Sequence, residues 1–153
     1  MPVLRSAGFV VFRDTPEGRR YLLLRASRKE SLVAAGKTVK EFWDFPKGEL
    51  EKGETGIDAA RRETREEAGI GYLEVIEGFK ATARYFSQKD GKPALKFVAM
   101  FLGRAGDLDL TLSWEHDRYE WLAYGVARER ITLPQMKEVL EKAGRFLEEQ
   151  NSI

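Results

Sequence analysis

The sequence predicts an α/β domain in which a mixed β-sheet lies between helices. Apolar runs with the lengths of strands stand before and after a helix expected over residues 56–68, and an amphipathic helix ends the chain from about Pro134. This order is typical of a sheet covered by helices. The 153 residues suffice for one hydrophobic core, and 42% hydrophobic with 33% charged residues indicates a globular chain. We therefore expect a single domain spanning residues 1–153.

A pair of strands opens the chain. Residues 7–13 are apolar and rich in β-branched and aromatic side chains, and residues 21–25 (YLLLR) form a second apolar run. Residues 15–18 (TPEG) between them are turn formers, so the pattern predicts a hairpin or two adjacent core strands. Residues 27–41 are largely polar, and we expect a loop there that can hold one helical turn.

The first helix is marked at both ends. Thr55 can cap its N-terminus, with Asp58 three residues later as in a capping box, and Gly69 stands where a helix stop is expected. The helix is therefore predicted from about Gly56 to Ala68. One of its faces is expected to pack against the sheet, and that face holds Ile57, Ala60, Thr64 and Ala68.

The second half of the chain carries further strand patterns. Apolar or alternating runs predict strands at residues 73–76, 80–87, 95–102, 108–112 and 120–124. The Asp90-Gly91 pair is a strong hairpin signal. The run 95–102 is almost entirely apolar, which predicts a central position in the sheet.

The final helix has one apolar stripe. We expect Thr132 to cap this helix, with Gln135 three residues later. The stripe consists of Met136, Val139, Leu140, Ala143 and Leu147. Such spacing is typical of core packing and not of a cofactor site.

Three glutamates of the first helix stand on one side of it. Glu63, Glu66 and Glu67 occupy positions i, i+3 and i+4, so their carboxylates repel one another unless cations neutralise them. Mg²⁺ prefers oxygen ligands and binds through carboxylates together with substrate phosphates. Arg62, four residues before Glu66, can hold and orient that carboxylate. The alternative is a solvated helix face with ordinary Glu/Arg pairs.

The surroundings of these glutamates resemble the Nudix box. Residues 48–70, GELEKGETGIDAARRETREEAGI, match its fixed positions at Gly48, Glu54, Arg62, Glu63, Glu66, Glu67 and Gly69. Ile70 fits one of its aliphatic positions, and Thr64 departs from the other, although its methyl group can still pack inward. The resemblance implies the Nudix-type α/β/α sandwich and a metal-dependent hydrolase that cleaves a nucleoside diphosphate linked to another group.

Beyond the box, the chain resembles the asymmetrical diadenosine tetraphosphate hydrolases over most of its length. The matching features, in order, are Arg25-Ala26-Ser27, Trp43 with Pro46-Lys47-Gly48, Glu77-Gly78-Phe79-Lys80, Tyr85, Lys96, Ser113-Trp114-Glu115-His116 with Tyr119 and Trp121, and the last helix near Met136-Lys137. Two departures bear on the preferred substrate length. Glu49 stands where many relatives carry histidine, and residues 27–41 look longer than in the animal-type enzymes.

This resemblance implies roles in substrate binding. Tyr85 and Tyr119 would sandwich an adenine. This role makes physical sense, since stacking of a base on an aromatic ring contributes about 1 to 3 kcal/mol to binding. Lys47 and Lys96 would contact the polyphosphate. Each residue has a simpler alternative: Tyr85 can be a packing residue and Lys96 a solvated strand end. His116, the only histidine, is expected to pack or to form hydrogen bonds and not to catalyse.

The resemblance also implies a metal site and a reaction. The metal ligands would be the Gly48 carbonyl and the carboxylates of Glu63, Glu66, Glu67 and Glu115, with Glu54 and Arg62 positioning them. Glu115 can also be an ordinary loop acid. The reaction would be attack of water on a phosphorus of diadenosine tetraphosphate, giving ATP and AMP. Mg²⁺, with Mn²⁺ as an alternative, would lower the pKa of the bound water, and Glu67 or Glu66 would be the base.

Two other functions stay open at this stage. One is a different Nudix pyrophosphohydrolase, acting on RNA 5' ends, diphosphoinositol phosphates or damaged nucleotides. The other is a Nudix-fold binding module without catalysis, which would be expected to lose the metal carboxylates that this chain carries.

Charge and composition restrict the partners. With 26 basic and 25 acidic residues there is no overall field for a long nucleic acid, so a dinucleoside polyphosphate or nucleotide is the expected ligand. The absence of cysteine excludes disulfides, thiolate nucleophiles and Cys-ligated zinc. No apolar stretch approaches the roughly 18 residues of a membrane helix, and the N-terminus lacks a signal-like pattern. We therefore expect a cytoplasmic monomer that does not bind membranes.

Overall fold

The computed structural model describes residues 1–27, 36, 40–106 and 109–151. Its elements follow one another as β1 (Val3–Thr15), β2 (Gly18–Ala26), β3 (Trp43–Asp44), β4 (Lys47–Glu49), α2 (Gly56–Ala68), β5 (Glu74–Val75), β6 (Ala81–Lys89), β7 (Lys92–Arg104), β8 (His116–Leu122), α3 (Tyr124–Arg130) and α4 (Pro134–Asn151). Among these, no helix is long and apolar enough to cross a membrane.

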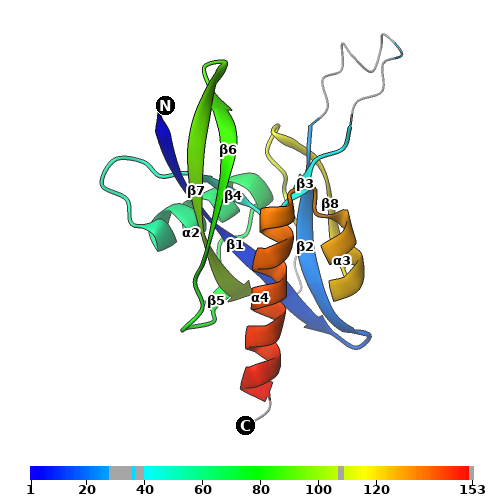
Figure 1. Cartoon of the computed structure of the whole chain (residues 1–153). Coiled ribbons are helices and arrows are strands. Elements are labelled where there is room, and N and C mark those ends of the chain that lie inside the picture. Colours follow the sequence, from blue (N-terminus) through cyan, green and yellow to red (C-terminus); the bar gives the residue numbers. More distant parts are fainter. Residues whose placement is uncertain (28–35, 37–39, 107–108, 152–153) are drawn as a thin grey trace.

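The strands form one mixed sheet between helices, which confirms the predicted fold class (Figure 1). One path across the sheet runs β3, β2, β1, β7 and β5, while β4 pairs with β1, β6 with β7 and β8 with β2. Strands β1 and β7 are parallel, from Val3 opposite Leu95 to Phe12 opposite Arg104. The other pairings among the described strands are antiparallel.

The predicted hairpins are both present. Strands β1 and β2 pair up to Thr15 opposite Gly18. Strands β6 and β7 meet at the two-residue turn Asp90-Gly91, whose φ angles of 52° and 75° are the positive values that such a hairpin turn requires. Strand β7 lies between β1 and β6, so its central position is confirmed.

Helix α2 begins and ends at the predicted residues. The Thr55 hydroxyl accepts a hydrogen bond from the Asp58 backbone N–H at 3.3 Å, and Gly69 ends the helix with φ 73°. The residues of the predicted inner face pack as expected: Ala60, Thr64 and Ala68 are buried and Ile57 is partly buried.

The strand predicted at residues 108–112 is wrong for its described part, since residues 109–112 are not in a strand and Leu108 lies outside the described residues. This segment runs along the C-terminal end of α2 instead. The Thr111 N–H donates to the Ala68 carbonyl at 3.1 Å. Leu110 and Leu112 still pack inward, against the core beside α2. The alternation therefore reflects packing on a helix end and not pairing in a sheet.

The strand predicted at residues 120–124 begins four residues earlier and ends two residues earlier than expected. Strand β8 covers His116–Leu122, and Tyr124 already begins α3, which the sequence did not predict. The N-cap residue of α3, Ala123, makes no side-chain hydrogen bond to the helix. A seven-residue helix without a capping side chain leaves little pattern in a sequence.

Two hydrophobic cores hold the sandwich together. The α2-side core includes Ala7, Phe9, Leu22, Leu24 and Ala60. The α4-side core, on the opposite face of the sheet, includes Val10, Phe12, Leu23, Met100 and the whole predicted stripe of α4, namely Met136, Val139, Leu140, Ala143 and Leu147. The predicted packing of the last helix is thus confirmed.

The segment before α4 is fastened to β3. The Thr132 hydroxyl, predicted as a helix cap, accepts a hydrogen bond from the Trp43 backbone N–H at 2.8 Å. The Thr132 N–H donates in turn to the Trp43 carbonyl at 3.1 Å. The Leu133 carbonyl accepts from the Lys137 N–H as α4 begins. Most of the loop predicted at residues 27–41 lies outside the described residues.

Candidate active site

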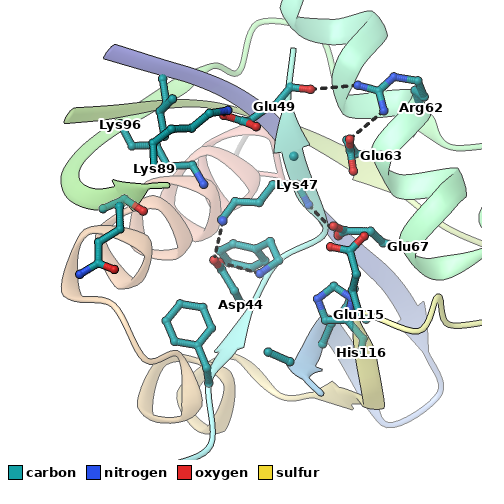
Figure 2. A pocket seen from close by; sticks show the side chains of 18 of the residues that line it. Asp44, Lys47, Glu49, Arg62, Glu63, Glu67, Lys89, Lys96, Glu115 and His116 are labelled. Atoms are coloured by element: carbon teal, nitrogen blue, oxygen red, sulfur yellow. Dashed lines mark hydrogen bonds and ion pairs between the residues drawn. The ribbon is translucent and has the colours of Figure 1, made fainter. Parts of the chain in front are cut away.

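A cleft of about 530 Å³ is formed by residues of α2, β4, β6 and β7, next to the N-terminal part of β1. We call it the main cleft (Figure 2). It is lined by most of the predicted site residues and by several others, chiefly Asp44, Lys47, Gly48, Glu49, Arg62, Glu63, Glu67, Lys89, Lys96, Glu115 and His116. Its volume lies within the range of small-molecule sites in proteins.

Gly48 brings strand β4 against helix α2. It pairs with Ala7 of β1, and a Cβ atom at position 48 would overlap the Glu63 carboxylate. Gly8 is under a similar constraint, since a Cβ there would overlap the Pro46 carbonyl oxygen. Glycine at position 48 is therefore required for the close approach of the Glu63 carboxylate to the β4 backbone.

Glu67 is the most deeply buried carboxylate of the helix, with 5% of its surface exposed. Its Oε2 accepts a hydrogen bond from the Lys47 backbone N–H at 3.0 Å. Burial raises the pKa of Glu67 to about 8 against the effect of this hydrogen bond, and the nearby Glu63 and Glu115 carboxylates raise it further. A cation in the main cleft would relieve this repulsion.

Arg62 holds the surrounding carboxylates, as predicted. Its Nε and Nη2 donate to the two oxygens of Glu54 at 2.7 and 3.0 Å, while Nη1 donates to Glu63 at 2.7 Å and to Glu66 at 3.1 Å. Hydrogen bonds from Arg62 and from the Glu51 N–H lower the pKa of Glu54 to about 2. The guanidinium thus fixes the charged form of Glu54 and the direction of two helix carboxylates.

Glu115 reaches the main cleft through a loop tied at two places. The Ser113 N–H donates to the Glu67 carbonyl at 3.2 Å, which anchors the loop to the end of α2. Ser27 donates through its N–H to the Glu115 carbonyl at 2.8 Å and through its hydroxyl to the Trp114 carbonyl at 2.7 Å. These bonds place Glu115 on the cleft wall although it lies far from the Nudix box in the sequence.

The carboxylates have the chemistry to bind a divalent cation, but their present positions do not form a complete coordination site. Within the described part of the chain, no three acidic or histidine side chains are arranged to hold a metal by themselves. Glu63 faces Arg62, and Glu66 is exposed at the rim of the helix and does not line the main cleft. The carboxylates that line the cleft nonetheless offer oxygen ligands, and buried Glu67 lies in the field of Glu63 and Glu115. This chemistry fits a hard cation that draws the carboxylates inward when it binds.

The opposite wall of the main cleft carries cations. The Lys47 ammonium lies 3.2 Å from Oδ2 of Asp44. Asp44 is buried, and its other oxygen, Oδ1, accepts a hydrogen bond from the Phe45 N–H at 2.7 Å. Burial opposes the charge of Lys47, but Asp44 and Tyr85 together outweigh it and raise the pKa of Lys47. Burial lowers the pKa of Lys96 to about 8, with the like charge of Lys47 acting in the same direction.

Asp44, Lys89 and His116 are cleft residues that the sequence analysis did not assign to the site. Asp44 gives a weak signal in the sequence, as a single acid between the aromatic residues Trp43 and Phe45. His116 has a buried Nδ1 without a hydrogen-bond partner among the described residues, and burial lowers its pKa.

The two predicted adenine-binding tyrosines contact different cores. Tyr85 of β6 is partly buried against the α4-side core, and Tyr119 of β8 packs against the α2-side core. Neither lines the main cleft. Tyr85 does lie beside Lys47, which lines the cleft, and the role of the two tyrosines in sandwiching adenine stays a prediction.

Known proteins are similar to this chain over most of its length. The sequence pattern of the NUDIX domain matches residues 3–143. The chain is 33% identical to a bis(5'-nucleosyl)-tetraphosphatase [asymmetrical] of Sus scrofa over 148 residues, which cover 94% of this chain and 95% of that protein. It is 32% identical to an RNA pyrophosphohydrolase of Nitratiruptor over 125 residues, 73% of this chain and 80% of the other.

A solved structure has the same architecture. The chain is similar to a C. elegans Ap4A hydrolase in a binary complex, with a TM-score of 0.73 and 30% identity over 94% of this chain and 97% of that chain. The extent of these matches and the retained carboxylates lead to one conclusion: this chain belongs to the Nudix family and is a Nudix pyrophosphohydrolase.

Proposed function

We propose that the protein hydrolyses diadenosine tetraphosphate asymmetrically, to ATP and AMP. The observation that carries the proposal is the sequence identity of 33% to an asymmetrical tetraphosphatase, which extends over nearly the full length of both chains. The main cleft supports it, because carboxylates line one wall and Lys47 and Lys96 the other. A polyphosphate with a divalent cation fits between walls of opposite charge.

The metal would be held by the carboxylates of Glu63, Glu67 and Glu115, with Glu66 and the Gly48 carbonyl completing the set. When bound, Mg²⁺ or Mn²⁺ would lower the pKa of the attacking water and neutralise negative charge on the phosphoryl oxygens. Arg62 keeps the carboxylates of Glu63 and Glu66 directed along the helix face.

Glu67 is better placed than Glu66 to accept the proton of the water. Glu67 lines the main cleft, whereas Glu66 is exposed and does not line it. Because Oε2 of Glu67 already accepts a hydrogen bond from the Lys47 N–H, Oε1 is the atom that would accept the proton of the attacking water. On the opposite wall, the Lys47 ammonium, oriented by Asp44, and that of Lys96 would bind phosphate oxygens.

Product analysis tests the proposal directly. The protein is incubated with diadenosine tetraphosphate and Mg²⁺, and nucleotides are separated by anion-exchange chromatography. We expect ATP and AMP in equal amounts, and no turnover after chelation of the metal. Glu67→Gln is expected to lower the rate by roughly 10² to 10⁴ fold, as for loss of a general base, and Glu66→Gln by less.

Other outcomes are equally informative. Two molecules of ADP per substrate would contradict asymmetric cleavage. Absence of turnover, together with release of pyrophosphate from RNA carrying a 5' triphosphate, would favour the function named for the Nitratiruptor relative.

A further inference from the structure

A second hollow of about 560 Å³ opens beside the main cleft. We call it the side hollow. Arg5, Leu50 and Lys52 line it and do not line the main cleft, whereas Glu49, Glu51 and Lys89 line both. The shared residues place the two hollows side by side, so a long ligand can reach from one across their boundary into the other.

An exposed ion pair marks the boundary between the hollows. Lys89, at the end of β6, lies 3.4 Å from the carboxylate of Glu49, at the end of β4, and about half of each side chain is exposed. Figure 2 shows both residues next to Lys96. Ion pairs with this exposure contribute little stability, so a phosphate can take Lys89 away from Glu49 at small cost.

The side hollow itself has the chemistry of a nucleoside site. The Arg5 guanidinium lies over the Phe97 ring, 5.4 Å from its centre, which holds this planar cation against the sheet. The Leu50 N–H donates to the Arg5 carbonyl at 2.9 Å, so the apolar Leu50 is fixed beside it. Guanidinium planes and apolar side chains stack on bases, and the Glu49 and Glu51 carboxylates can accept hydrogen bonds from ribose hydroxyls and base amino groups. A bare phosphate would be repelled by the same carboxylates.

We propose that the side hollow binds the distal nucleoside of a dinucleoside polyphosphate, while Lys89 contacts the phosphates that connect it to the main cleft. This inference rests on the proposed function, since it concerns the second half of that substrate. It assigns two further residues to substrate recognition: Arg5, which lies outside the Nudix box, and Lys52, which lies within it but at none of its fixed positions.

A pair of substrates tests the proposal. Diadenosine tetraphosphate and adenosine 5'-tetraphosphate carry the same number of phosphates, and only the first has a distal nucleoside. Arg5→Gln is expected to lower kcat/KM for diadenosine tetraphosphate by about five- to tenfold, mainly through KM, and to leave the value for adenosine tetraphosphate within about twofold. Lys52→Gln should act in the same direction and serves if Arg5→Gln does not fold.

The matched control is Lys92→Gln. Lys92 pairs with Lys89 across the hairpin, is exposed and lines neither hollow, so its loss should leave both substrates unaffected. Equal losses on the two substrates would show a general charge effect and overturn the proposal, as would no loss on either.

Failure of the proposed function would be visible separately, as absence of cleavage by the wild-type protein. Calorimetric titration of Glu67→Gln with each of the two nucleotides in the presence of Mg²⁺ then tests separately whether the side hollow binds a distal nucleoside. Tighter binding of diadenosine tetraphosphate that disappears when Arg5→Gln is added supports the distal site. Binding that is equally strong for both nucleotides overturns it.

Discussion

Glu67 shows at the scale of one residue how folding prepares the cleft for a cation. Its side chain is almost fully withdrawn from water, and its nearest compensating group is a backbone N–H, not a cationic side chain. Glu63 and Glu115 add negative charge around it. The metal-free protein therefore keeps a proton on Glu67 under conditions in which an exposed glutamate has lost it.

This leads to a pH dependence of stability in the metal-free protein. The pKa of Glu67 rises from 4.5 to about 8 on folding. Between these values the folded chain binds a proton that the unfolded chain does not, so the free energy of unfolding falls as pH rises. We expect the Tm in chelator to decrease from about pH 5 to pH 8. Burial also raises the pKa of Glu63, which acts in the same direction.

Thermal unfolding of wild type and Glu67→Gln across this pH range is the measurement. The variant should show a flatter profile, and Mg²⁺ should raise the wild-type Tm most at the alkaline end, where the carboxylates are ionised. Parallel profiles for the two proteins would contradict the assignment of the proton to Glu67.

Residues of the site differ in how far the sequence could predict them. Glu63 and Glu67 lie on one helix turn, so their spacing alone places them together. Asp44 and Lys89 reach the same cleft from strands whose positions depend on tertiary pairing, and no local spacing connects them. Tyr119 shows the opposite case, since a role implied by resemblance is not matched by a position in the cleft.

At the scale of elements, α2 is the part of the fold most fully specified by its own sequence. Its cap, its apolar face and its stop are all local, and the structure reproduces both of its ends. Strands β3 and β4, with two and three residues, are too short to show a period, so tertiary pairing decides them. Within residues 109–112, the Thr111 N–H, which could have entered a sheet, instead donates to the Ala68 carbonyl at the end of α2.

The cap of α2 can be tested by substitution. Thr55→Ala removes the hydroxyl that accepts the Asp58 N–H and is expected to lower the free energy of unfolding by about 0.5 to 1 kcal/mol. Thr55→Ser should restore most of the loss because it keeps the hydroxyl. Denaturant unfolding of the three proteins gives the comparison, and equal stabilities would show that this cap contributes nothing.

The whole molecule depends on two cores that share one sheet. Successive residues of β1 and β2 alternate between them, as Phe9 and Val10 do. The α2-side core supports the helix that carries the carboxylates, and the α4-side core includes residues of β7, the strand that carries Lys96. Damage to either core should therefore lower global stability more than it changes the chemistry of the cleft.

Leu140→Ala tests this division. Leu140 is fully buried in α4, and its truncation is expected to destabilise the protein by about 2 to 5 kcal/mol through lost burial and a cavity. The folded variant should keep kcat close to wild type at a temperature well below its Tm. Lys142→Ala on the exposed side of α4 is the control, with an expected change within about 0.5 kcal/mol. A large loss of kcat in the folded variant would show that α4 acts on the cleft directly.

The parallel pairing of β1 with β7 has a kinetic consequence. It joins Ser6 to Val98 and Phe12 to Arg104, residues separated by most of the chain. Folding rates fall as the mean sequence separation of contacts grows, because the entropy of closing such a loop is lost before the contacts form. Lys96 lies on β7, and Lys47 on a strand that pairs with β1. The cationic wall of the cleft is therefore complete only after this long closure, so a chain released before β7 is synthesised carries the Nudix box without that wall.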